Sequence, residues 1–181
     1  MTKKVITYFF ILVFGILLFN NKLFAQNRID TLLSIKKLIQ QHSTVSGSGV
    51  GLFSSSSKYW YAFAYLAHLA TNEELAEMTN DNNTAIKIYA YLGLSYNNYL
   101  NLKSIKKRLW KDNATVNTFF GCISGRDMDV ASCIKYYTKR YYDEIWTKKL
   151  LTFLKENEEY RNQLYDELLN DKKISRPLLV D

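Results

Sequence analysis

Residues 57–96 constrain the fold most, because two apolar segments rich in alanine and tyrosine flank a short acidic one. Residues 63–67 (FAYLA) return in similar form as residues 89–93 (YAYLG). Apolar side chains would surround a helix over residues 58–70 on nearly all sides, and such a helix is buried on most of its surface. The pattern therefore predicts a helix, a short helix and a third helix that pack into one core.

Helix-start signals divide this region. The sequence Thr71-Asn-Glu-Glu74 has the pattern of a capping box, in which a hydroxyl and a carboxylate satisfy N–H groups at a helix start. Ser57 is suited to cap the preceding helix. The three helices are expected over residues 58–70, 72–79 and 85–97, the last capped by Asn83 or Thr84.

The remaining chain also favours helices, since it contains a single proline, and proline disrupts helix interiors. Residues 112–129 are expected as a loop with a short extended piece at 116–120. Asp30 is the expected start of a first helix, and Asp127 or Asp129 that of the helical segment from residue 130. The further helices are expected over residues 31–42, 100–111, 130–155 (one helix or two) and 158–170. The prediction is an all-α fold of about six or seven helices.

The string ATNEELAEMTNDNNTAIKIYAYLGL (residues 70–94) resembles a HEAT-like helical repeat. In such repeats an "EEL" helix is followed by an Asp/Asn turn and by a helix with a "YA…L" core. Asn82-Asn83 stands where these repeats commonly have Asn-Pro. Small exported bacterial proteins of unassigned function carry similar segments. The resemblance implies an antiparallel helical bundle or short solenoid that presents a binding surface, and it implies almost nothing about activity.

The first 25 residues have the pattern of a secretory signal peptide. Lys3 and Lys4 precede an apolar run over residues 5–19, and a polar break then leads to Ala25. The run is shorter than the roughly 18–20 residues that span a bilayer comfortably. We expect cleavage near Ala25 and a secreted or periplasmic product, with an uncleaved anchor as the alternative.

The expected mature chain is a single all-α domain over residues 26–175, followed by a flexible tail over 176–181. Cleavage would remove three lysines and lower the formal net charge from +7 to +4. So small an excess does not favour a nucleic-acid partner. We expect a monomer.

Cys122 and Cys133 are the two cysteines of the chain, and in an oxidising compartment such a pair can form a disulfide. We predict this bond, with two small buried thiols as the alternative. Two cysteines without a neighbouring histidine do not make a zinc site. No metal or cofactor is predicted.

Residues 43–57 are rich in glycine and serine. The spacing of Gly47, Gly49 and Gly51 is GxGxG, which differs from the dinucleotide-binding fingerprint. We expect a flexible connector, with a loop that contributes to a binding surface as the alternative.

Few residues offer catalytic chemistry. His42 is expected at a helix end, and His68 is expected in or beside the core. Glu73, Glu74 and Glu77 are the densest carboxylates before the C-terminal helix, and paired carboxylates across a groove can hydrolyse glycosides. On a capped surface helix they are more simply solvated. An enzyme is therefore the less favoured reading.

The helix expected over residues 100–111 is the most basic part of the mature chain, and its basic side chains are expected to face out: Lys103, Lys106, Lys107, Arg108 and Lys111. Tyr96 and Tyr99 precede it among asparagines and are expected to be exposed. The predicted binding residues are Tyr96, Tyr99, Lys103, Lys107 and Lys111. The leading hypothesis is an exported, non-catalytic helical interaction module that binds a protein partner. The alternatives are a small secreted hydrolase using Glu73, Glu74 or Glu77, and an envelope-associated protein whose basic face contacts anionic membrane surfaces.

Overall fold

The computed structural model describes residues 26–50, 55–121, 123–138, 141–175 and 177. The chain divides into two compact units, Met1–Ser34 and Ile35–Asp181. The described part of the first unit, residues 26–34, is helical, so Asp30 lies within a helix and does not begin one as predicted. The predicted signal peptide lies outside the described residues, and so does the predicted tail apart from Pro177.

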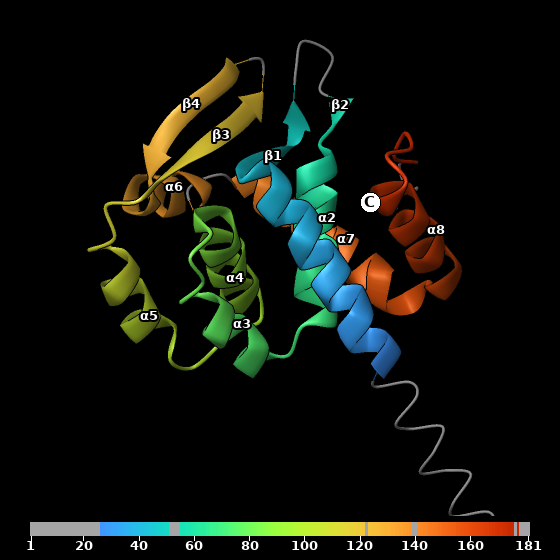
Figure 1. Ribbon diagram of the computed structural model, residues 1–181, viewed down its shortest axis with the longest axis horizontal. Coiled ribbons are helices and arrows are strands. Elements are labelled where there is room, and N and C mark those ends of the chain that lie inside the picture. The colour runs from blue at the N-terminus through green and yellow to red at the C-terminus, as the bar shows by residue number, and fades with distance from the viewer. Residues whose placement is uncertain (1–25, 51–54, 122, 139–140, 176, 178–181) are drawn as a thin grey trace, which may run out of the picture. The chain divides into compact units, whose positions relative to one another are not determined.

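The second unit contains the predicted helices, with ends that differ from the predictions by a few residues. It begins with a helical segment over residues 35–42. The segment predicted over residues 130–155 is two helices (Figure 1). The labelled helices are α2 Lys58–Leu69, α3 Asn72–Met78, α4 Thr84–Tyr96, α5 Leu102–Leu109, α6 Val130–Tyr137, α7 Tyr141–Glu156 and α8 Glu158–Leu169.

The all-α prediction is wrong, because this unit also contains a four-stranded mixed sheet with the strand order β2-β1-β3-β4. β1 pairs in parallel with β3, and the other two pairings are antiparallel. The glycine- and serine-rich segment expected as a connector therefore supplies two strands, and the short extended piece is one arm of a hairpin. The strands are β1 Thr44–Val50, β2 Ser55–Ser56, β3 Thr115–Gly121 and β4 Ile123–Asp129.

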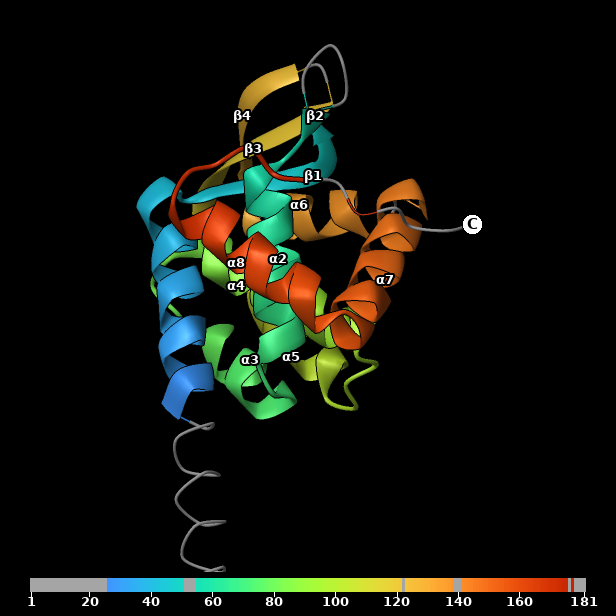
Figure 2. The ribbon, with the colours of Figure 1, turned by 90° about the vertical axis from the view of Figure 1, so that its right-hand side faces the viewer.

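The sheet lies at one end of the second unit, with the helices on one side of it (Figures 1 and 2). α2 is central and contacts α4, α7, α8 and β1. Its residues 60–67 are all buried, as the apolar pattern predicted. The core thus surrounds the first of the two tyrosine- and alanine-rich segments.

The capped helices in this core form as their signals predicted. The Glu74 N–H donates to the Thr71 hydroxyl, and the Thr71 N–H donates to the Glu74 carboxylate. α4 approaches α3 and α2 closely at Gly93. A Cβ added there would lie 3.1 Å from a methyl carbon of Leu75 and 3.3 Å from the Cβ of Ala67. The missing side chain therefore permits the contact between α4 and its two neighbours.

Tyr89 joins the helices to the sheet. Its ring is fully buried and stacks on Phe63, with 5.0 Å between centroids. Its hydroxyl accepts a hydrogen bond from the Ser46 N–H at 3.0 Å and donates one to the Thr44 carbonyl oxygen at 3.3 Å. The Ser46 hydroxyl is hydrogen-bonded to that of Ser57, the N-cap of α2. One buried polar network therefore connects α4, β1 and α2.

The change Tyr89→Phe should lower the free energy of unfolding by about 1–3 kcal/mol, because it leaves the buried Ser46 N–H without its partner. Chemical denaturation measures this difference. The matched control is Tyr91→Phe, on the same helix, which removes a hydroxyl from a similarly buried ring outside the network. Equal stability of the two variants would contradict the role assigned to Tyr89.

Candidate functional site

The turn after α4 determines where α5 begins. Asn98 adopts a left-handed conformation with φ of 53°, which asparagine tolerates better than most residues. The Tyr99 N–H donates to the Leu94 carbonyl oxygen and the Asn98 N–H to that of Ser95, the pattern of a Schellman motif. The chain therefore reverses sharply here. Leu100, the next residue, is 96% exposed at the N-terminal end of α5.

Two kinds of contact hold α5 in place. Ile105 and Leu109 are buried, and α5 contacts α4. The Arg108 guanidinium donates hydrogen bonds to the Thr79 hydroxyl and to the Asn80 side-chain oxygen at the end of α3. Arg108 is thereby occupied within the fold, and lysines supply the remaining positive charge of the helix.

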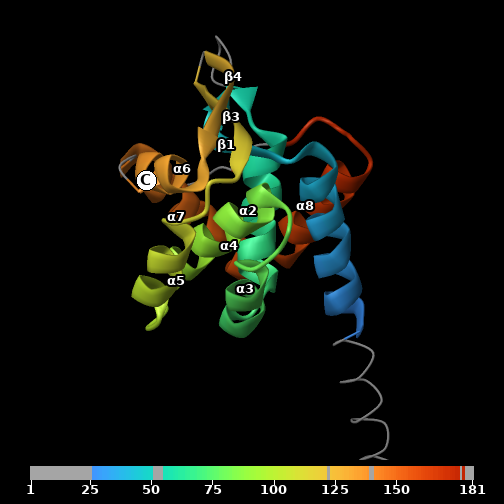
Figure 3. The same cartoon turned by 60° about the vertical axis from the view of Figure 1, so that its left-hand side comes forward.

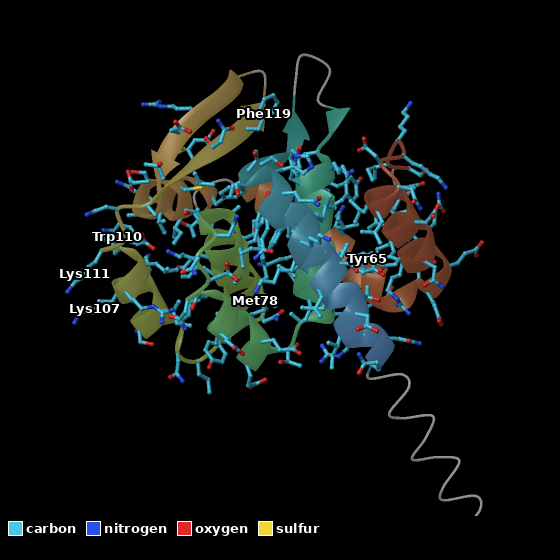
Figure 4. The ribbon with its side chains drawn as sticks, in the orientation of Figure 1. Tyr65, Met78, Lys107, Trp110, Lys111 and Phe119 are labelled. Atoms are coloured by element: carbon cyan, nitrogen blue, oxygen red, sulfur yellow. The ribbon has the colours of Figure 1, made fainter. Side chains whose placement is uncertain are left out.

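The outer side of α5 carries four exposed lysines and an exposed tryptophan. Trp110 is 46% exposed, and the Lys106 ammonium lies 5.2 Å from the centre of its ring. A shallow hollow of about 340 Å³ is lined by Trp110 and three of the lysines. Figure 4 shows Lys107, Trp110 and Lys111 along the outside of α5. The α5 surface consists of Leu100, Lys103, Lys106, Lys107, Trp110 and Lys111.

The charge of the α5 surface is not offset by acids that neighbour it in the sequence. The sequence has no aspartate or glutamate between Asp81 and Asp112. Asp112 forms an ion pair with Lys87 at 2.7 Å, and this bond lowers the pKa of Asp112 below its usual value. Asp81 pairs with Lys36 at 2.6 Å, and although burial raises its pKa, the bonds from Lys36 and Asn83 bring the net value below the usual one. Both carboxylates flanking this acid-free stretch are therefore neutralised by other lysines.

The predicted binding residues are only partly brought together. Lys103, Lys107 and Lys111 share the α5 surface, because four-residue steps keep to one side of a helix. Tyr96 and Tyr99 are half-buried, and the Tyr96 ring lies 6.2 Å from that of Phe63. The predicted set omitted three members of the surface, namely Leu100, Lys106 and Trp110. Lys106 was expected on the outer side of the helix but was not among the predicted binding residues, and helical spacing would also have indicated Trp110.

The carboxylates of the hydrolase alternative do not form a site. Glu74 is bonded in the capping box, and Glu73 and Glu77 are exposed on α3. They line neither the α5 hollow nor a second, polar hollow of about 580 Å³ formed by Gln40 and residues 80–83. That second hollow presents amides and the paired Asp81, a set without a free acid–base couple.

The two histidines are also poor candidates for catalysis. Burial lowers the pKa of His68 to about 4, and the positive charges of Arg161 and Lys155 act in the same direction. His68 is therefore neutral near pH 7, against the side of Tyr65. His42 is exposed, with its ring 5.1 Å from that of Tyr59.

The predicted disulfide is wrong, because Cys133 is a free cysteine that is fully buried in α6. Burial, together with the charge of Asp129, raises the pKa of its thiol to about 12. The thiol is therefore protonated and serves as a small apolar core group. Cys122 lies outside the described residues.

Comparisons with known proteins do not identify a family: no family model, curated protein or solved structure matches the chain. The resemblance to HEAT-like repeats therefore stays a prediction. Within the described ranges, no three His, Cys, Asp or Glu side chains gather in a way that could hold a metal ion. None of the described helices has the length and apolar character needed to span a bilayer.

Cys133 should react with iodoacetamide at least about a hundredfold more slowly in the folded chain than in the urea-unfolded chain, because the thiolate is the reactive form. Peptide mapping by mass spectrometry after timed alkylation measures the rate at this position. Similar rates in the two states would contradict the burial of the thiol.

Proposed function

We propose that the protein is an exported, non-catalytic interaction module whose α5 surface binds a negatively charged macromolecule. The observation that carries this proposal is the set of four exposed lysines around Trp110, in a stretch whose flanking aspartates are both paired elsewhere. The N-terminal sequence pattern supports export. An acidic protein or an anionic membrane surface would be a partner of this kind.

Like charges gathered on one helix repel one another, by a few tenths of a kcal/mol for each pair at helical spacing. An anionic partner would relieve this repulsion and would also cover the exposed Trp110 ring. Arg108 and the buried Ile105 and Leu109 hold α5 against the fold, so that binding requires little ordering of the backbone. A fixed, charged and partly aromatic surface of this kind favours binding over catalysis.

A photo-reactive benzophenone amino acid in place of Lys107 should form a covalent adduct with the partner when the cells that make the protein are irradiated. The matched control places the same group at Lys135, which is exposed on α6. Mass spectrometry identifies the adduct as protein or lipid. Adding Lys103→Glu and Lys111→Glu should lower the adduct yield roughly tenfold, since attraction is replaced by repulsion.

Adducts of equal yield at positions 107 and 135 would contradict the proposal, and so would their absence at position 107. Adducts at position 107 that persist in full after the two charge reversals would show that charge does not drive the binding.

A further inference from the structure

We infer that the α5 surface binds the anionic headgroup region of a lipid bilayer, with Trp110 entering the interface. This inference rests on the proposed function and names its partner. Three features support it: the type of cation, the position of the apolar side chains and the surroundings of the helix.

Four of the five exposed cations on α5 and directly after it are lysines, and the fifth is Arg108. Protein interfaces are enriched in arginine and depleted of lysine, because the arginine fork gives directed, bidentate bonds. Here the one arginine of the helix is bonded within the fold, to Thr79 and Asn80. Lysine ammonium groups on flexible stems need no fixed geometry to attract a diffuse layer of anionic lipid. The type of cation therefore favours a membrane surface over a protein.

The apolar side chains of the α5 surface lie at its two ends. Leu100 precedes the helix and Trp110 follows its last residue, so the eight-residue helix, about 12 Å long, lies between them. A protein hot spot usually gathers such anchors at the centre of an interface. Tryptophan at one end of a row of lysines instead matches the preference of its ring for the boundary between water and lipid.

The surroundings of α5 suit a flat partner. Figures 1 and 3 show α5 at the edge of the second unit, with no described helix or strand over its outer side. The hollow beside Trp110 is shallow, and its lining is made by lysine stems and the indole ring. A broad, negatively charged and deformable surface can contact all four lysines at once, whereas a rigid partner would need matching acids.

The test uses the fluorescence of Trp110 in vesicles whose acyl chains carry bromine, a contact quencher. The full chain can be used, because residues 1–25 contain no tryptophan and the measured fluorescence therefore does not come from that segment. The chain has two other tryptophans, the buried Trp60 and the half-buried Trp146, and subtraction of the spectrum of Trp110→Phe removes the contribution of both. The lipids are phosphatidylcholine alone or mixed with phosphatidylglycerol.

The expected result is quenching and a blue shift of Trp110 emission with phosphatidylglycerol vesicles at low salt. Binding to phosphatidylcholine alone should be at least about tenfold weaker, since each lysine near an anionic surface contributes to attraction. The pair Lys103→Glu and Lys107→Glu should abolish the quenching. The matched control, Lys135→Glu with Lys173→Glu, carries the same change in net charge at exposed positions outside the α5 surface and should retain it. Circular dichroism confirms that each variant is folded.

Absence of quenching with phosphatidylglycerol at low salt would overturn the inference, and so would equal quenching by both lipid compositions. If vesicles fail to bind but residue 107 still forms an adduct with an acidic protein, the membrane inference fails and the proposed function stands. If neither vesicle binding nor an adduct is found, both fail.

Discussion

The arrangement of the helices and the sheet depends on the hydrogen bonds of the Tyr89 hydroxyl. This hydroxyl is fully buried, and burial raises its pKa well above the ordinary tyrosine value, so it stays protonated and can donate to the Thr44 carbonyl oxygen. The Tyr89 hydroxyl oxygen also accepts a hydrogen bond from the Ser46 N–H, and the Ser46 hydroxyl is hydrogen-bonded to that of Ser57 at the start of α2. In a low-dielectric interior each polar group of such a network needs a hydrogen-bond partner, because an unpaired buried polar group lowers the stability of the fold. The position of β1 is therefore fixed by the helical core that it covers.

This dependence explains why the helices could be predicted from the sequence and the sheet could not. A helix is marked by local signals, and the Thr71–Glu74 box and the Asn83 cap act within three or four residues. The pairing of β1 with β3 joins Thr44 to Asn117, far apart in sequence, and β1 is rich in glycine and serine. Its strand conformation depends on Tyr89 and on β3, neither of which is visible in the local pattern. The disulfide prediction failed for a similar reason, because cysteine spacing does not show that Cys133 lies on the inner side of α6.

Part of the candidate site could be predicted from the sequence, because helical spacing is a local signal. Lys103, Lys107 and Lys111 follow from helical spacing alone, since Ile105 and Leu109 define the inner side of α5. Two other features depend on the tertiary structure. Arg108, although exposed, is bonded to Thr79 and Asn80 at the end of α3, and Leu100 is almost fully exposed after the turn at Asn98. Tyr96 and Tyr99 are half-buried because of tertiary packing, and their position among asparagines did not indicate this.

The ion pairs around α5 determine how its charge responds to solution conditions. The bond from Lys87 lowers the pKa of Asp112, so the stabilising pair is fully present above the pKa of an unfolded aspartate. Its contribution is lost only as the pH falls through the lowered, folded-state value. Asp81 behaves in the same way through Lys36 and Asn83. Neither aspartate therefore becomes available to neutralise Lys103 or Lys107 at neutral or mildly acidic pH. Salt, which screens exposed charges over about 10 Å at 0.1 M, is the condition to which the α5 surface should respond most strongly.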